Sequence, residues 1–350
     1  MTLPCAAPII KTHDLRVYYP ITRGALRRVV GRIRAVDGVS LSIGAGETLG
    51  LVGESGCGKS TLGLALMRLA PATSGTAYYL GEDPPVDILR ARGSDSRRLR
   101  LAIQMVFQNP ASSLNPRATA GGSVAEPIRL NRLASPREVN GRVERLLTMV
   151  GLGAWHGRRY PSQLSGGQRQ RVVIARALAL ESRVIIADEP VSALDVSVQA
   201  QILNLLNDLK AAMNLTYLFI SHNLDVVRHM ANRIAVMYLG RIVELGPADE
   251  VCTAPRHPYT ETLLSAILVP DIDVQRARRR IVPRGDVPDA AAPHEGCPFH
   301  TRCLYAKPRC EVEVPLLDEV SPGCHVACHL AGELTLAGID AQYASRGVKP

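Results

Sequence analysis

Residues 53–61 read Gly53-Glu54-Ser55-Gly56-Cys57-Gly58-Lys59-Ser60-Thr61, between apolar runs over residues 48–52 and 62–69. A strand, a glycine-rich loop, Lys-Ser and a helix in this order form the pattern of a phosphate-binding loop. Glycines let the backbone N–H groups turn toward phosphates, and the helix adds the positive end of its dipole. The plainer alternative is a glycine-rich turn before a core helix, and the complete order of elements weighs against it.

This loop predicts a nucleoside triphosphate site. We expect the Lys59 amine to reach the β- and γ-phosphates and the Ser60 hydroxyl to ligate Mg²⁺. The residues that we expect to contact the nucleotide here are Gly53, Ser55, Gly56, Cys57, Gly58, Lys59, Ser60 and Thr61.

A second helix start with anion-binding character follows about a hundred residues later, at Leu164-Ser165-Gly166-Gly167-Gln168. Ser165 can cap this helix, and its free N–H groups face outward. Here the chain resembles the ATP-binding subunits of ABC transporters, whose LSGGQ signature it carries unchanged. The resemblance implies a head-to-tail dimer in which Ser165, Gly166, Gly167 and Gln168 of one ATPase close on the ATP held by the other, an identical or a related chain.

The apolar stretch 184–188 ends in an acid, Asp188, and a second acid, Glu189, follows it directly. A buried strand of this kind delivers charge to the carboxyl edge of a parallel sheet. The resemblance implies that Asp188 holds the Mg²⁺ shell and that Glu189 orients and deprotonates the attacking water. Two solvated carboxylates at a strand end are the alternative.

Four further residues match positions of the same family. Gln108 resembles the Q-loop glutamine, which contacts Mg²⁺ or the water and reports nucleotide state to membrane subunits. His222 resembles the switch histidine that contacts the γ-phosphate, and Asp195 resembles the D-loop residue that communicates across the dimer. Tyr19 is the candidate for stacking on adenine, with Tyr18 as the alternative. Without the resemblance, Gln108 is a strand-end amide and His222 a structural histidine.

Composition favours a large globular chain without membrane spans of its own. The 350 residues are 46% hydrophobic with a mean hydropathy of +0.05, enough for one large α/β domain and an appendage. No run approaches the roughly 18 apolar residues of a transmembrane helix. The first residues lack the basic-then-apolar layout of a signal peptide. We therefore expect a peripheral protein on the cytoplasmic face of the inner membrane, held there by its partners.

A net charge of +9 is compatible with nucleic-acid binding, so the distribution of the basic residues matters. Residues 23–34 hold five arginines and no acid, which predicts a basic loop or hairpin, and a second arginine cluster over residues 90–100 surrounds Asp95. Such runs are either solvated faces or lie near anionic lipid headgroups. Three Phe and one Trp offer few platforms for base stacking, so no nucleic-acid partner is expected.

The predicted fold class is α/β, a P-loop NTPase core of the ABC type with an inserted helical subdomain and a small cysteine-rich C-terminal extension. We place the ATPase domain at residues 1–250, its helical subdomain at about 115–180, and the extension at 251–350. Patterning predicts a helix over 196–213 and a hairpin over 234–238 and 241–244. Strands are predicted over residues 15–19, 35–43, 48–52, 103–107, 184–188 and 216–220.

A segment near the C-terminus indicates one branch of this family. It reads Pro255-Arg256-His257-Pro258-Tyr259-Thr260 and is followed by Leu263-Leu264. This segment resembles the C-terminal extension of the oligopeptide/dipeptide importer ATPases, a branch that includes nickel importers. The resemblance implies import of peptides or a related small solute with two membrane permeases and an external binding protein, which set the specificity. The alternatives are a non-transport ABC ATPase acting on ribosomes or DNA, and a structural metal-binding module with an inert ATP site.

Five of the eight cysteines fall between residues 297 and 328. A cytoplasmic chain has no oxidising compartment to pair them. Cys297, Cys303, Cys310 and Cys328 resemble the pattern that holds a [4Fe–4S] cluster in some of these ATPases, with Cys324 as a surplus residue. Four thiolates suit Zn²⁺ as well, so cluster, zinc and no metal all stay open.

Overall fold

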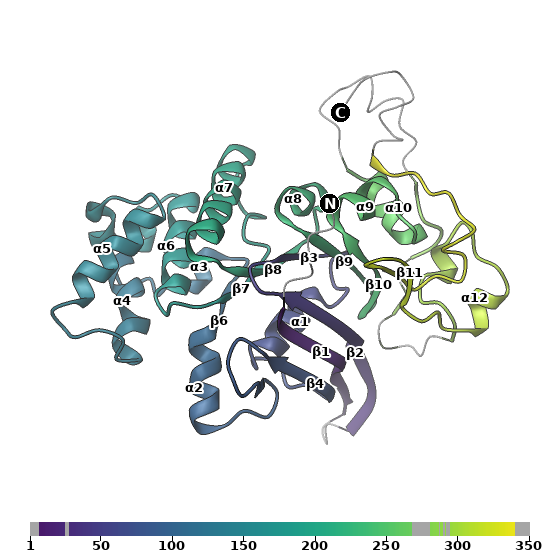
Figure 1. Ribbon diagram of the computed structural model, residues 1–350, viewed down its shortest axis with the longest axis horizontal. Coiled ribbons are helices and arrows are strands. Elements are labelled where there is room, and N and C mark those ends of the chain that lie inside the picture. The colour runs from purple at the N-terminus through teal and green to yellow at the C-terminus, as the bar shows by residue number, and fades with distance from the viewer. Residues whose placement is uncertain are drawn as a thin grey trace. The chain divides into compact units, whose positions relative to one another are not determined.

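The computed structural model describes residues 7–24, 28–267, 281–286, 288, 289, 291 and 295–339 (Figure 1). The chain divides into two compact units. The first comprises Met1–Ile10, Ser42–Thr48 and Tyr78–Ile220, and the second comprises Lys11–Leu41, Leu49–Ala77 and Ser221–Pro350. Arg27 of the basic run lies outside the described residues.

Three parallel strands form the sheet of the first unit: β6 (Ile103–Val106) pairs with β7 (Val184–Asp188), which pairs with β8 (Thr216–Ser221). Every residue of β7 and β8 is buried, as expected for parallel strands covered on both faces. Parallel strands end at the same edge of a sheet. The predicted residues Gln108, Asp188 and Glu189 therefore come from neighbouring strand ends.

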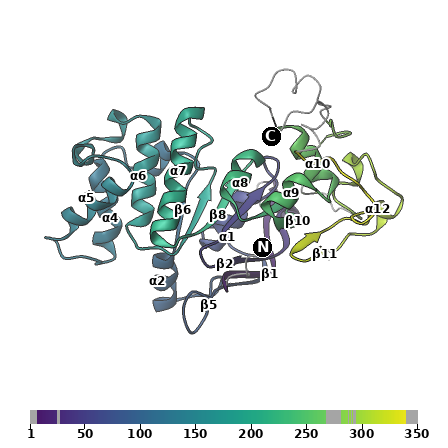
Figure 2. The same cartoon turned by 45° about the horizontal axis from the view of Figure 1, so that its top comes forward.

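Helices α4 (Ala120–Leu130), α5 (Val139–Met149) and α6 (Gly166–Leu178) pack against one another (Figure 2). In α5 the side chains at the three- and four-residue spacing of the sequence pattern, Val139, Val143, Leu146 and Leu147, are buried. The helix α7 (Val196–Met213) packs on α6 and ends at Asn214 in the left-handed conformation, a common helix stop. The other elements of this unit are β5 (Val86–Asp87), α2 (Gly93–Ala102), α3 (Pro110–Ser113), η1 (Ala154–Arg158) and η2 (Pro161–Gln163).

The second unit joins the phosphate-loop strand to the cysteine-rich extension in one sheet. Strand β3 (Thr48–Val52) runs parallel to β9 (Arg233–Tyr238), and β10 (Arg241–Pro247) returns antiparallel to β9. From the extension, β12 (Cys324–Val326) pairs with β10, and β11 (Asp318–Ser321) pairs with β12. Among the described residues of this unit, the helices are α1 (Lys59–Leu66), α8 (Leu224–Met230), α9 (Ala248–Thr253), α10 (Pro258–Ser265), η3 (His300–Arg302) and α12 (Arg309–Val312).

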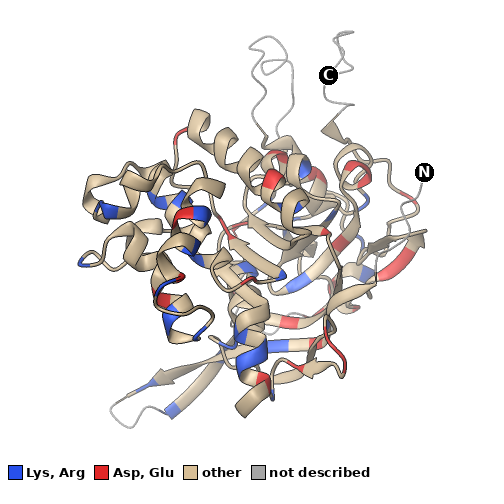
Figure 3. Ribbon diagram, turned by 60° about the vertical axis from the view of Figure 1, so that its left-hand side comes forward, with Lys and Arg blue, Asp and Glu red and all other residues tan. Residues whose placement is uncertain are grey.

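Strands β1 (Pro8–Arg23) and β2 (Arg28–Gly44) form a hairpin, and β4 (Ser74–Tyr79) lies on the other side of β1. Basic residues lie in the described strand ends of the β1–β2 hairpin (Figure 3). The predicted basic segment is therefore a hairpin, and Val29 and Val30 beside its arginines are 58% and 61% exposed. The predicted strands 15–19 and 35–43 are too short. Strand β1 already begins at Pro8, where the adjacent Ile9 and Ile10 are both buried and break the simple alternation. The end of β1 after residue 19 and the start of β2 before residue 35 carry no buried residues, so the sequence pattern does not mark them.

Elsewhere the structure departs little from the predicted elements. The helix after the phosphate loop ends at Leu66, earlier than the apolar run to residue 69, and Arg68 takes a left-handed backbone conformation just beyond it. Within the described ranges no helix has both the length and the apolarity to cross a membrane.

Two glycine-to-alanine substitutions, one in β3 and one in α5 as a control, test how tightly β3 is packed. A Cβ on Gly50 would lie 2.1 Å from Val227 Cγ1 and 3.1 Å from Ala231 Cβ, so Gly50→Ala should destabilise the protein by about 1–3 kcal/mol through overpacking. Gly141 in α5 has no closer neighbour than the Arg145 terminal nitrogen, at 3.8 Å, so Gly141→Ala should stabilise by about 0.5–1 kcal/mol. Melting temperatures followed by circular dichroism compare the two, and a Gly50→Ala protein that melts at or above wild type would contradict the packing.

Candidate ATP site and cysteine pocket

Close backbone packing gives the phosphate loop its shape. Gly53 has φ 154°, and a Cβ there would lie 2.2 Å from the Met237 carbonyl oxygen. Gly58 has φ 107°, and a Cβ there would lie 1.9 Å from the Ala35 carbonyl oxygen. Only glycine fits both positions. The Gly240 N–H donates to the Cys57 carbonyl at 2.8 Å, which ties the loop to the turn between β9 and β10.

The Lys59 amine lies inside the curl of this loop. Its Nζ donates to the Gly53 carbonyl at 2.7 Å and to the Glu54 carbonyl at 2.9 Å, and the residue is 4% exposed. The adjacent Ser60 is an exposed residue at the start of α1. The roles of Lys59 in contacting phosphate and of Ser60 in ligating Mg²⁺ stay predictions.

Cys57 shares the loop with Lys59 but differs from a reactive thiol. It is 4% exposed, and burial raises its pKa, although the charge of Lys59 acts in the opposite direction. A buried thiol with a raised pKa stays protonated and reacts slowly.

In the first unit, the structure brings two predicted catalytic residues into contact. Gln108 Nε2 donates to the Glu189 carboxylate at 2.8 Å. Asp188 is buried at the end of β7, and the Glu189 N–H donates to the Ile220 carbonyl at 2.9 Å. Glu189 has φ 46°, a left-handed conformation that non-glycine residues adopt at a cost and that is common at functional sites. His222 follows β8 directly and is exposed.

The signature segment forms the N-terminus of α6. The Ser165 hydroxyl accepts from the Gln168 N–H at 3.3 Å, and the Gln168 side chain accepts from the Ser165 N–H at 3.0 Å. This capping box leaves Ser165 and Gly166 exposed at the helix start. A Cβ on Gly167 would lie 2.6 Å from Val198 Cγ1, so Gly167 serves the packing of α6 on α7. Asp195 precedes α7 and is exposed.

The two tyrosines proposed for adenine differ in their contacts. The Tyr18 hydroxyl donates to Asp37, and Arg241 donates to the same carboxylate at 2.7 and 3.0 Å. Burial opposes ionisation of Asp37, but these hydrogen bonds outweigh it and lower the pKa of the carboxyl group. Tyr19 is 36% exposed, which leaves its ring accessible to a base.

Sequence reasoning missed two residues that contact the phosphate loop from the C-terminal extension. The Tyr259 hydroxyl accepts from the Glu54 N–H at 2.7 Å, and Arg302 donates twice to the Glu54 carboxylate. Both pairs span more than 200 residues, and no spacing in the sequence signals either contact.

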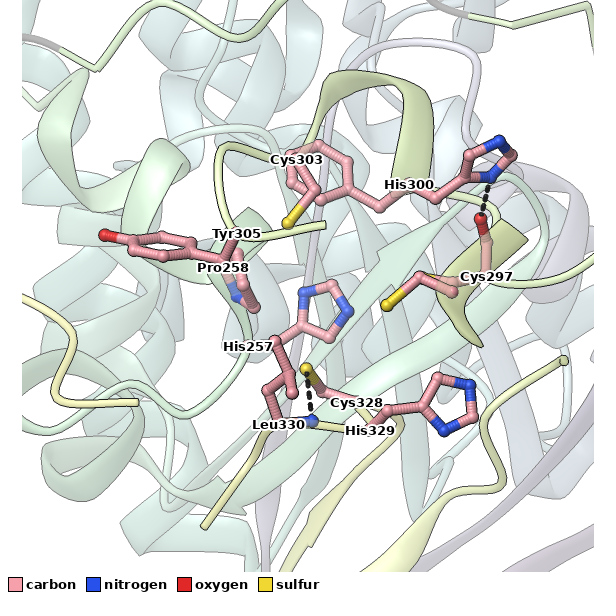
Figure 4. Close-up of a pocket in the computed structure, with 11 residues that line it drawn as sticks. His257, Pro258, Cys297, His300, Cys303, Tyr305, Cys328, His329 and Leu330 are labelled. Atoms are coloured by element: carbon pink, nitrogen blue, oxygen red, sulfur yellow. Dashed lines mark hydrogen bonds between the residues drawn. The ribbon is translucent and has the colours of Figure 1, made fainter. Parts of the chain in front are cut away.

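The four predicted cysteines, Cys297, Cys303, Cys310 and Cys328, line one cavity in the extension (Figure 4). Burial, with a smaller contribution from the neighbouring thiols, raises the pKa of Cys297 to about 12 and that of Cys303 to about 11. Cys324 lies apart from this lining and donates to the Glu250 carboxylate at 3.1 Å.

This cavity has a soft donor set, since its sulfur atoms suit iron–sulfur clusters and zinc. Across the described ranges, however, no three His, Cys, Asp or Glu side chains are grouped closely enough to hold a metal ion. Zinc needs its thiolates about 2.3 Å from one point. The predicted cysteines are therefore gathered, but no ready zinc site is formed among the residues described.

Two family descriptions match successive parts of the sequence: "ABC transporter" matches residues 36–192, and "Oligopeptide/dipeptide transporter, C-terminal region" matches residues 243–310. The oligopeptide transport ATP-binding protein AppF of Bacillus subtilis (strain 168) is 49% identical over 331 residues, 94% of this chain and 99% of that protein. The chain belongs to the ATP-binding subunits of ABC transporters, in the oligopeptide/dipeptide branch.

Other comparisons agree with this membership. The di/tripeptide transport ATP-binding protein DppF of Pseudomonas aeruginosa (strain UCBPP-PA14) is 47% identical, over 93% of this ABC ATPase and 99% of that protein. A dimeric ATP-binding cassette solved in a post-hydrolysis state with ADP and phosphate has a TM-score of 0.59 and 30% identity, covering 68% of this chain and 98% of that one. The predicted family, the P-loop fold and ATP hydrolysis are confirmed.

The tyrosine pair of this ABC ATPase can be separated by mutation. Tyr19→Ala should weaken ATP binding about tenfold, because the stacking platform is lost, whereas Tyr19→Trp should retain it. Tyr18→Phe removes only the hydrogen bond to Asp37 and should leave ATP affinity within about twofold of wild type. Titration with a fluorescent ATP analogue measures all three, and a larger loss in Tyr18→Phe than in Tyr19→Ala would reverse the assignment.

Proposed function

We propose that this ABC ATPase hydrolyses Mg·ATP to power the import of di- or oligopeptides, or a related small solute, across the cytoplasmic membrane. The names of its relatives AppF and DppF describe peptide transport, and the match covers nearly the whole chain. The observation that carries the catalytic part is the 2.8 Å hydrogen bond between Gln108 and Glu189 beside the buried Asp188. It joins the residue assigned to water activation to the residue assigned to coupling.

In the proposed reaction, Glu189 takes a proton from the water that attacks the γ-phosphorus. Lys59 and His222 stabilise the charge that develops on the transferred phosphoryl group. Ser60, Asp188 and Gln108 offer the oxygen ligands that suit Mg²⁺, which supplies charge neutralisation on the phosphates when bound. Tyr19 stacks on adenine, and the remaining loop residues cradle the phosphates through their backbone N–H groups.

The proposed partners are two integral membrane permeases, an extracytoplasmic binding protein and a second ATPase subunit. The second ATPase would place its own Ser165 and Gly166, or their equivalents, on the ATP bound here. Exposed groups at the predicted interface support this, since Ser165, Gly166 and Asp195 are exposed and the apolar Val196 beside Asp195 is 82% exposed. We place the protein peripherally on the cytoplasmic face of the inner membrane, with ATPase domain 1–250, helical subdomain 115–180 and extension 251–350.

Reconstitution tests the import function. The chain, purified with its two co-expressed permeases and second ATPase, should drive ATP-dependent uptake of a labelled peptide into vesicles in the presence of the binding protein. Glu189→Gln keeps the shape of the side chain but lacks the base, so it should bind ATP and dimerise while phosphate release and uptake fall at least about a hundredfold. Near-normal hydrolysis would remove Glu189 from its role. Co-purification with ribosomes or DNA in place of membrane proteins would favour the non-transport alternative.

We also propose that Cys297, Cys303, Cys310 and Cys328 hold a [4Fe–4S] cluster that stabilises the extension. The support is their common cavity, and the position of Cys324 outside it agrees with its exclusion from the ligand set.

Metal analysis of anaerobically purified protein tests this assignment. About four iron and four sulfide per chain are expected, and each of these four Cys→Ser changes should lower that content. Cys324→Ser is the matched control and should lower it little. If stoichiometric zinc is found without iron, the site is a zinc site and the cluster proposal is wrong. If neither metal is found, the proposal is wrong and the cavity has only a packing role.

A further inference from the structure

Glu54, the second residue of the phosphate loop, is held at each of its polar groups. Its N–H donates to the Tyr259 hydroxyl at 2.7 Å, and its carbonyl accepts from Lys59 Nζ at 2.9 Å. Its carboxylate accepts two hydrogen bonds from the Arg302 guanidinium, at 2.8 and 3.0 Å. Two residues of the C-terminal extension thus fix a residue of the ATP site.

Both of these residues are buried among aromatic rings. Tyr259 is 0% exposed, and its ring centroid lies 4.6 Å from that of Tyr238 and 5.4 Å from that of Phe299. Arg302 is 7% exposed, with its Cζ 5.8 Å from the centroids of the same two rings. A guanidinium removed from water in this way needs an anionic partner, and Glu54 is that partner.

Buried hydrogen bonds fix the helix that carries Tyr259. The Glu244 carboxylate, on β10, accepts from the Arg256 and His257 N–H groups at 2.8 and 3.0 Å and from the Thr260 hydroxyl. Since β10 pairs with β9, beside the phosphate-loop strand, the start of α10 has a fixed position relative to the loop.

The backbone segment that carries two of the cavity's cysteines also holds Arg302 in position. It ends the short turn η3, which lies between Cys297 and Cys303 in the chain. The His300 N–H donates to the Cys297 carbonyl at 3.0 Å, and the Cys303 N–H donates to the His300 carbonyl at 3.2 Å. Phe299, which packs on Arg302, also lines the cavity. The backbone that places two of the thiols therefore also places the guanidinium.

Charge explains why this contact matters for nucleotide. An ionised carboxylate in a phosphate-binding loop repels the phosphates, whereas a bidentate arginine cancels that charge and fixes its geometry. We propose that Arg302 and Tyr259 are positioning residues of the ATP site, Arg302 by neutralising Glu54 and Tyr259 by fixing the loop backbone, so that ATP affinity depends on the cysteine-rich extension.

Direct binding of MgATP to the full chain tests the proposal, independently of any transported solute. Arg302→Gln should raise the Kd for MgATP about tenfold, with a much smaller change in kcat at saturating ATP. Adding Glu54→Gln removes the uncancelled charge and should return the Kd to within about threefold of wild type. Tyr259→Phe should raise the Kd about threefold, and Glu54→Gln should not reverse that change.

Arg309→Gln is the matched control, because it breaks an exposed arginine–glutamate pair with Glu313 in the same extension and should leave the Kd unchanged. A normal Kd in Arg302→Gln, or a defect that Glu54→Gln fails to reverse, would overturn the charge argument and reduce Arg302 to a folding role. If Arg302→Gln does not fold, Arg302→Lys keeps the positive charge and loses the bidentate geometry. The charge argument then predicts a Kd within about threefold of wild type, and a tenfold rise would overturn it.

Discussion

A phosphate-binding loop must turn its backbone N–H groups toward the ligand, and that constraint governs the surroundings of residues 53–58. The chain must curl tightly at residues 53–58 while its other face packs against neighbouring backbone, with the Met237 and Ala35 carbonyls where side chains would otherwise stand. Strand β9 and the middle of β2 therefore help to set the shape of the phosphate loop.

Uniform burial and clear periodicity made several elements predictable. Strands β3 and β7 and helix α7 have the bounds that the sequence indicates, because all residues of these strands are buried and α7 carries a regular apolar stripe. The contact between Gln108 and Glu189 follows from the same logic, since both come at the carboxyl ends of adjacent parallel strands. Chemistry placed at a sheet edge can thus be found from patterning.

Other features depend on contacts that no local pattern encodes. The pairing of Arg302 with Glu54 spans 248 residues, and the choice between Tyr18 and Tyr19 rests on Asp37, which only the fold brings to Tyr18. Gly167 belongs to the signature by sequence, yet its missing side chain makes room for Val198. Cysteine spacing indicated a group, and the group forms around a cavity, but the distances within it are set by packing that the spacing does not contain.

The burial of Cys57 bears on how the chain meets oxidative stress. Oxidants attack thiolates, and this thiol is kept protonated and covered although it lies within the nucleotide loop. Both effects slow the formation of a sulfenic acid at this position by peroxide. The chain thus carries a cysteine within its phosphate-binding loop in a form that reacts slowly with oxidants.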